Sequence, residues 1–153
     1  MADHIRHVVC PHCDSVNRVP ANRPAREAKC GRCHKALFTG APVAVSARSF
    51  ERHIQHDRIP VLVDFWAEWC GPCHTMAPVF TRVAGELEPE VRFLKLDIEA
   101  APDIATRYNV RSIPMLILFK NGLVVAQRAG AIDERTLRAW LQQHMQAPGG
   151  VAA

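Results

Sequence analysis

The chemistry of this chain is concentrated in its six cysteines, which form three Cys-x-x-Cys pairs. The pairs are Cys10/Cys13, Cys30/Cys33 and Cys70/Cys73. In an oxidising compartment such a set indicates a disulfide framework, whereas in a reducing compartment it indicates metal binding or redox catalysis. Residues 1–7 have neither the apolar run nor the cleavage site of a secretory signal. We therefore expect a cytoplasmic protein that uses its cysteines for metal or redox chemistry.

The third pair has the pattern of a catalytic dithiol. The sequence Cys70-Gly71-Pro72-Cys73 follows an apolar run at 61–66 that is broken only by Asp64, and it precedes a stretch with helical spacing. At a helix N-terminus, unpaired N–H groups and the helix dipole lower a thiol pKa from about 8.5 towards neutrality. We expect Cys70 to be an exposed nucleophile and Cys73 to resolve the mixed disulfide. Gly71 and Pro72 should limit motion in the short loop.

Two other interpretations of the pairs are rejected. Residues 70–74 and residues 30–34 both match the Cys-x-x-Cys-His signal for covalent haem attachment. That chemistry needs export and an apolar haem pocket, and the sequence predicts neither. The third pair could also be half of a metal site, but its place between a strand and a helix favours catalysis.

The first two pairs have the spacing of a four-cysteine zinc site. Two residues separate the cysteines within each pair, and 16 separate Cys13 from Cys30. Four thiolates favour zinc, which is redox-inactive and can fold a segment too small to have its own core. We expect one structural Zn²⁺ per chain, bound by Cys10, Cys13, Cys30 and Cys33. Disulfides among these cysteines, or a site that uses His7, His12 or His34, remain open alternatives.

Composition divides the chain into four segments. Residues 1–38 have no sustained helical or strand periodicity and should need a bound metal to stabilise their fold. Residues 39–42 are predicted to be a linker. Residues 43–146 alternate strand and helix patterns, and residues 147–153 read as a flexible tail. The 43–146 segment should therefore form one domain of ordinary size behind a small module.

The domain at 43–146 should have the element order βαβαβαββα. The expected strands are 43–45, 61–66, 91–98, 115–119 and 123–128, the last two forming a hairpin at Asn121-Gly122. Ser49 is the expected N-cap of a helix at 50–56, Pro78 predicts a kink in the second helix, and Asp133 should cap the last. This order predicts an α/β fold, with a mixed central sheet flanked by helices.

Charge and hydropathy exclude some partners. The formal net charge of +4 arises in residues 1–40, and a zinc tetrathiolate would contribute −2 there. Nucleic-acid binding is therefore not expected, and no apolar stretch approaches the roughly 20 residues that span a membrane. No Gly-x-Gly-x-x-Gly is present, so the chain should bind neither flavin nor nicotinamide.

Two motifs carry a resemblance to a known family. Val63 to Cys73, which reads Val-Asp-Phe-Trp-Ala-Glu-Trp-Cys-Gly-Pro-Cys, is similar to the active-site segment of thioredoxins, and 111–114 (Arg-Ser-Ile-Pro) resembles their second hallmark. The resemblance covers 43–146. Residues 9–20 resemble the opening of the second type of bacterial thioredoxin, which carries an N-terminal zinc ribbon. Together, the two resemblances imply a thioredoxin fold preceded by a small zinc-ribbon domain.

The resemblance implies roles for residues around the third pair. Pro114 should be a cis-proline facing the pair, with the Ile113 backbone binding an extended substrate segment and Trp69 flanking the site, beside Gly71 and Pro72. His74 and Met115 depart from the usual family residues, which puts the substrate preference in doubt.

It also implies a route for protons. Asp64 matches the family's buried acid, which exchanges protons with Cys73 through water, and Lys95 matches the lysine beside that acid. Burial should raise the pKa of Asp64 and so suit it to this role.

The expected function is protein-disulfide reduction by cycling of Cys70 and Cys73. The expected partners are disulfide-containing proteins and an NADPH-dependent thioredoxin reductase that restores the dithiol. An alternative is a redox-sensing zinc module or a holdase built on a thioredoxin domain, and a nucleic-acid-binding ribbon is a third hypothesis.

Overall fold

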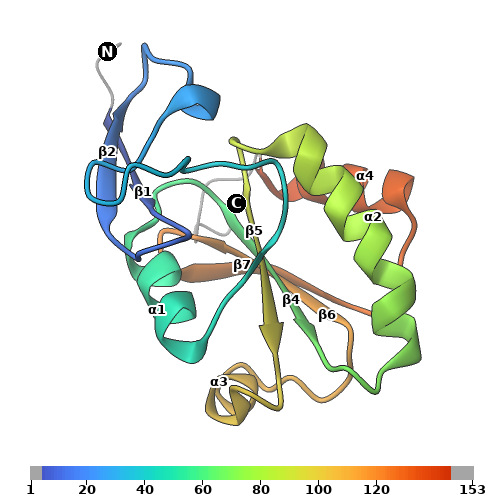
Figure 1. The fold of residues 1–153 in the computed structure, drawn as a ribbon. Helices are drawn as coiled ribbons and strands as arrows, with labels where there is room; N and C mark the ends of the chain where they lie inside the picture. The colour runs from blue at the N-terminus through green and yellow to red at the C-terminus, as the bar shows by residue number, and fades with distance from the viewer. Residues whose placement is uncertain (1–4, 146–153) are drawn as a thin grey trace.

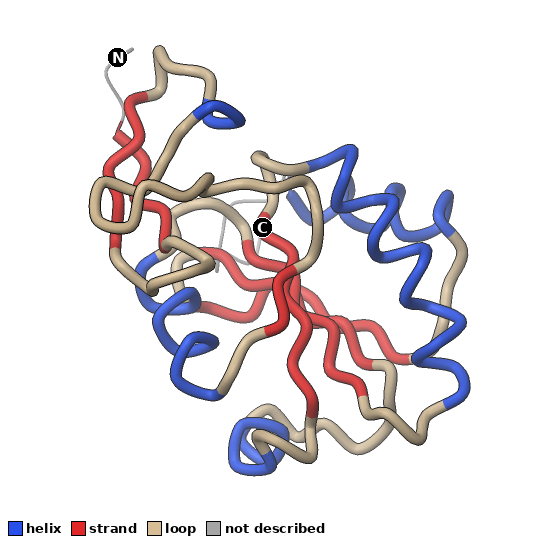
Figure 2. Tube along the Cα trace, viewed as in Figure 1, coloured by secondary structure: helices blue, strands red, loops and turns tan. Residues whose placement is uncertain are grey.

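The computed structural model describes residues 5–145 in two connected parts (Figure 1). We call residues 5–38 the ribbon and residues 43–145 the sheet domain. The ribbon contains strands β1 (Ile5–Val9) and β2 (Val16–Pro20), which pair antiparallel, and a short 3-10 helix at Ala25–Glu27. The rest of it is loop (Figure 2). The sequence did not predict the two strands, and the tail predicted at 147–153 lies outside the described residues.

The sheet domain has the predicted element order. It runs β3 (Val43–Ala44), α1 (Ala47–His56), β4 (Val61–Trp66), α2 (Gly71–Leu87), β5 (Arg92–Asp97), α3 (Pro102–Arg107), β6 (Met115–Lys120), β7 (Leu123–Ala129) and α4 (Glu134–Met145). The strands lie in the order β3-β5-β4-β6-β7. Strands β3, β5 and β4 are parallel, β6 runs antiparallel to β4, and β7 runs antiparallel to β6. The prediction of a mixed sheet is confirmed. Within residues 5–145, no helix combines the length and the apolarity needed to cross a membrane.

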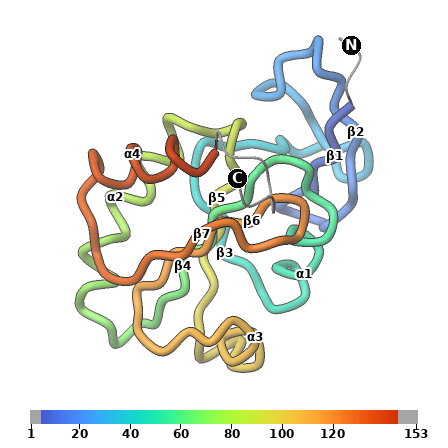
Figure 3. Tube along the Cα trace, turned by 180° about the vertical axis from the view of Figure 1, so that it is seen from behind, coloured from blue at the N-terminus to red at the C-terminus, as the bar shows by residue number. Residues whose placement is uncertain are grey.

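Helices cover both faces of the sheet, as the views from front and back show (Figures 1 and 3). Helices α2 and α4 pack on one face, where their buried side chains meet Leu62, Phe93, Leu116 and Leu118. Helices α1 and α3 pack on the other face against Val61, Val63, Phe65, Leu94, Leu96 and Ile117. Alternate residues of β4 therefore point into different cores, as the pleat of a strand requires.

The helix ends refine two predictions. Helix α1 is capped by Ser46, whose Oγ accepts the N–H of Ser49 at 3.1 Å, so the prediction of Ser49 as the cap is wrong. Ser49 instead lies inside the first turn and supplies a donor. Asp133 caps α4 through the N–H of Thr136 at 2.8 Å, as predicted. Helix α2 continues through Pro78, and the kink there stays a prediction.

The connection between the two parts is packed against the sheet domain. The N–H of Gly40 donates to Glu88 Oε1 at 2.9 Å, just beyond the end of α2. Gly40 has φ of +76°, which favours glycine, and a Cβ on Gly85 would lie only 3.4 Å from the Gly40 carbonyl oxygen. The connection is thus held at the C-terminal end of α2 through Gly40.

Candidate active site and metal centre

Cys70 and Cys73 form a disulfide at the start of α2, just after the loop that follows β4. Cys70 is the N-cap residue of α2, its Sγ accepts the N–H of Cys73 at 3.1 Å, and the two Cα atoms are 5.3 Å apart. Gly71 and Pro72 are the first two residues of the helix. This is the location that the sequence predicted, and the N–H bond to sulfur is the interaction that would stabilise a thiolate after reduction.

The exposure predicted for Cys70 is wrong for this disulfide form. Cys70 is only 4% exposed and Cys73 only 2%. Both pack with Ala67 and against Ile113, whose carbonyl oxygen lies 3.7 Å from Cys70 Sγ. The Ile113–Pro114 peptide bond is cis, as expected. The loop before β6 therefore covers the sulfurs and brings a backbone acceptor to the reactive atom.

Trp69 provides an exposed aromatic surface beside the pair. It is 65% exposed, and its indole N–H donates to Glu99 Oε2 at 2.5 Å. Glu99 follows β5, whose C-terminal end lies beside that of its parallel neighbour β4. Sequence reasoning missed Glu99, although the convergence of parallel strand ends could have suggested it. The indole is thus held at the rim, where an extended peptide could contact it.

Asp64 is a buried acid without a hydrogen-bond partner. It is 0% exposed, and neither carboxylate oxygen has a partner in the described structure. Burial raises the pKa of Asp64 from 3.8 to about 7, while the charge of Lys95 acts in the opposite direction. Asp64 shares a face of β4 with Leu62, which packs under α2, the helix that carries Cys73. The group can therefore both accept and release a proton near neutral pH.

Lys95 lies beside Asp64 in the sheet. The two are register partners on β5 and β4, and Lys95 Nζ lies 4.5 Å from the centroid of the Trp66 ring. His74 meets the same ring edge-on at 6.2 Å, and its Nε2 lies 2.7 Å from the Glu68 carbonyl oxygen. The Trp66 indole thus contacts both Lys95 and His74, an arrangement that the sequence did not predict.

The buried acid leads to a prediction on stability. We expect Asp64→Asn to raise the free energy of unfolding relative to wild type, by an amount that grows as the pH rises from about 4 to about 7. Because the folded state holds the Asp64 proton more tightly than the unfolded state, the contribution of Asp64 to wild-type stability is most favourable at low pH and becomes less favourable through this window. At pH 8 the gain should be roughly 4 kcal/mol, because the pKa rises by about 3 units, from 3.8 to about 7, and each unit corresponds to about 1.4 kcal/mol.

Urea unfolding of both proteins at several pH values from 5 to 8 measures this difference. Asp103→Asn, which changes an exposed acid on α3, is the matched control and should show no such growth with pH. A constant difference between Asp64→Asn and wild type across the range would contradict a raised pKa.

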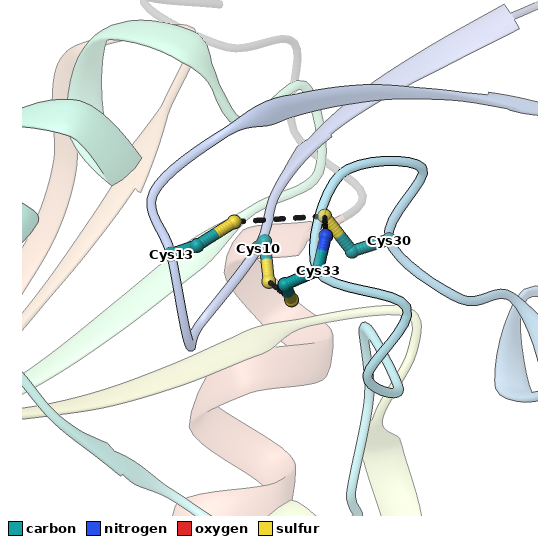
Figure 4. Close-up of side chains that lie close together, drawn as sticks. All are labelled: Cys10, Cys13, Cys30 and Cys33. Atoms are coloured by element: carbon teal, nitrogen blue, oxygen red, sulfur yellow. Dashed lines mark hydrogen bonds between the residues drawn. The ribbon is translucent and has the colours of Figure 1, made fainter.

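The four remaining cysteines converge at one point of the ribbon (Figure 4). Their Sγ atoms all lie within 4.8 Å of one another, and Cys10–Cys33 and Cys13–Cys30 are each 3.6 Å apart. A tetrahedral zinc ion with Zn–S bonds of about 2.3 Å requires sulfurs about 3.8 Å apart. Among residues 5–145, this is the one group of three or more close His, Cys, Asp or Glu ligand atoms. The geometry therefore fits a four-thiolate metal site.

Two similar turns hold these cysteines. In each, the first cysteine's N–H bonds to a carbonyl five residues on, and its own carbonyl accepts the N–H four residues on. The residues after each pair, Asp14 and His34, both have φ of +66°. Backbone N–H groups point at the sulfurs, with His12 donating to Cys10 at 3.3 Å and Arg32 to Cys30 at 3.3 Å. Such donors favour thiolates.

The thiols differ in their readiness to ionise. Burial raises the pKa of Cys10 to about 12, and the N–H groups that point at its sulfur only partly counter this. Burial acts in the same direction on Cys30, but donors from Cys33, Asn17 and Arg32 outweigh it and lower the pKa to about 5. A bound metal cation would stabilise the negative charge of the Cys10 thiolate, which burial disfavours.

The alternative ligands receive no support from the described geometry. The four cysteines are free thiols rather than disulfides, and no histidine among residues 5–145 joins their cluster. The His12 ring is directed elsewhere, with Nε2 3.1 Å from the carbonyl oxygen of Ala36.

Two family models match different parts of the chain. The thioredoxin family model matches residues 41–143, and the model for the N-terminal zinc ribbon of thioredoxin 2 matches residues 9–35. Thioredoxin C-3 of Corynebacterium nephridii is 43% identical over 143 residues, covering 94% of this chain and 98% of that protein. Thioredoxin of Rickettsia bellii is 39% identical over 101 residues, covering 66% and 96%. Thioredoxin 1 of Nostoc sp. is 38% identical over 105 residues, covering 69% and 98%.

Proposed function

Since the chain belongs to the thioredoxin family of thiol-disulfide oxidoreductases, we propose that it reduces protein disulfides in the cytoplasm with Cys70 and Cys73. The observation that carries the proposal is the Cys70–Cys73 disulfide at the N-terminus of α2, beside the Ile113 carbonyl group. Trp69 and the backbone of Ile113 and Pro114 would bind an extended segment of the substrate.

The reaction proceeds in two exchanges. The Cys70 thiolate attacks one sulfur of a substrate disulfide, which forms a mixed disulfide and releases the other sulfur as a thiolate. Asp64 accepts the Cys73 proton through water, and the Cys73 thiolate attacks Cys70 Sγ. The substrate leaves as a dithiol with two electrons gained, and the disulfide between Cys70 and Cys73 remains. Lys95 stabilises the ionised form of Asp64.

The regenerating partner must supply two electrons to this disulfide. An NADPH-dependent thioredoxin reductase is the partner class that does so, because the chain has no Gly-x-Gly-x-x-Gly motif for a nicotinamide or flavin of its own. Reduction returns both cysteines to the dithiol form and completes the cycle.

The ribbon would hold one structural Zn²⁺ on Cys10, Cys13, Cys30 and Cys33. When bound, zinc would fill a closed shell of four thiolates and fix the two turns of the ribbon, without redox chemistry of its own. The sulfur separations of 3.6 Å support this assignment.

Reduction of insulin disulfides by NADPH and a bacterial thioredoxin reductase tests the proposal. The wild-type chain should give continuous NADPH oxidation that depends on both the chain and the reductase. Elemental analysis of the same protein should find one zinc per chain. Folded, zinc-loaded chain without turnover would contradict disulfide reduction while leaving the metal assignment intact.

A further inference from the structure

A group of ionisable side chains is buried where the ribbon meets the sheet domain. His53, Asp57, Glu88 and Arg92 are each at most 1% exposed, and all four belong to the sheet domain. Arg92, the first residue of β5, is completely shielded from solvent. Burying a charged group costs several kcal/mol unless it is paired and hydrogen-bonded, so a guanidinium here needs defined partners.

Half of the partners of Arg92 come from the ribbon. Its Nη2 donates to the Val9 carbonyl oxygen at 2.9 Å, and its guanidinium carbon lies 4.4 Å from the centroid of the Phe38 ring. The other two are acids of the sheet domain, with Asp57 Oδ2 3.9 Å from Nε and Glu88 Oε2 3.5 Å from Nη1. Val9 and Phe38 flank the four metal-site cysteines on either side in the sequence.

Asp57 holds the same stretch of ribbon from a second direction. The N–H of Val9 donates to Asp57 Oδ1 at 2.7 Å, while Asp57 Oδ2 lies 2.5 Å from His53 Nδ1. Both polar groups of the Val9 backbone are thus bound by side chains of the sheet domain. The next residue is Cys10, a buried ligand of the proposed metal site, so these two contacts fix the backbone that presents its sulfur.

We call the contact between these four buried side chains and the ribbon residues Val9 and Phe38 the junction. The negative charge near the junction also requires a compensating positive charge. Four thiolates around a divalent metal carry a net charge of −2, and the nearest buried acids add to it. Among the described residues, Arg92 is the one lysine or arginine that is completely buried. We infer that Arg92 is a positioning residue of the metal centre, holding the Cys10 segment in its ligating geometry and supplying the positive charge that buried thiolates need. This inference rests on the proposed zinc binding.

Metal titration of the reduced full-length chain tests the role of Arg92. Co²⁺ is added first, because tetrahedral thiolate binding gives it a visible spectrum, and Zn²⁺ then displaces it to report the zinc affinity. We expect Arg92→Met to bind zinc roughly 10- to 100-fold more weakly, as for the loss of other residues that orient metal ligands. Arg92→Lys keeps the positive charge, and its zinc affinity should lie between those of wild type and Arg92→Met. Arg82→Met, which changes an exposed arginine on α2, is the matched control and should bind like wild type.

The outcomes separate this inference from the metal assignment. If wild type binds no metal, the zinc proposal fails first. If wild type binds zinc and folded Arg92→Met binds it equally well, the zinc proposal stands and the role of Arg92 is wrong. Circular dichroism and insulin reduction establish folding. If Arg92→Met does not fold, Arg92→Lys decides, because unchanged affinity overturns the inference and a loss of about threefold or more supports it.

Discussion

Replacing Cys70 by serine is expected to reduce NADPH-coupled insulin reduction to the uncatalysed background, a loss of at least roughly 1000-fold. A serine hydroxyl at this position is not ionised at neutral pH and cannot form the mixed disulfide. The N-terminal end of α2, which supports a thiolate at Cys70, has no comparable effect on an alcohol. The rate is followed as NADPH absorbance in the presence of excess reductase.

Cys73→Ser separates the two thiol roles. In this variant Cys70 can still attack a substrate, but nothing resolves the product, so a covalent complex should accumulate and be visible on a non-reducing gel. Turnover that is insensitive to Cys70→Ser would overturn the assignment of the nucleophile. Accumulation of complexes in Cys70→Ser rather than in Cys73→Ser would reverse the order of the two cysteines.

Removing the zinc ligands should produce the second large effect, on stability rather than on catalysis. We expect Cys10→Ser/Cys13→Ser to lose its zinc and the structure of the ribbon, because a segment this small depends on the metal for its fold. The sheet domain should then lose roughly 3 kcal/mol of unfolding free energy, since the buried Arg92 is left without its ribbon contacts. Urea unfolding followed by tryptophan fluorescence measures this, because all three tryptophans lie in the sheet domain.

Insulin reduction by the same double variant should change less than about threefold at 25 °C. The junction lies at the start of β4 and β5, whereas Cys70 follows the other end of β4, about 20 Å away along a strand of six residues. Wild type treated with a chelator is the control, and added zinc should restore its stability but not that of the double variant. Equal urea midpoints for wild type and the double variant would contradict the stabilising role of the ribbon.

The sequence predicted the sheet domain well because its signals are local and strong. The apolar run of β4, the Asn121-Gly122 turn and the Asp133 cap each follow from a few adjacent residues, and each is confirmed. The error at Ser46 and Ser49 has a simple origin. Both serines precede the helical spacing of Phe50 and Ile54, and only the backbone geometry decides which one accepts an N–H group.

The junction could not be predicted in this way. Arg92, Asp57 and Glu88 are charged residues of the kind usually found in solvent, and their burial depends on partners far away in the chain. The strands of the ribbon were not predicted for a related reason. Strands β1 and β2 have five residues each and bury few side chains, so their sequences show no sustained alternation of apolar and polar residues. Their position is set by the cysteine turns and by the contacts of Val9.

The pairing of Val9 with Arg92 also dictates the order in which the molecule can be assembled during synthesis. Val9 and Arg92 are 83 positions apart, and Cys33, the last of the four cysteines, precedes Arg92 by 59 positions. At ~5–20 residues per second, all four cysteines are therefore synthesised roughly 3 to 12 seconds before Arg92. Metal capture needs only the first 33 residues and can precede the rest of the fold. Docking must await β5. A nascent chain that has already taken up zinc therefore presents a pre-shaped ribbon to the growing sheet, whereas one without zinc presents four reactive thiols.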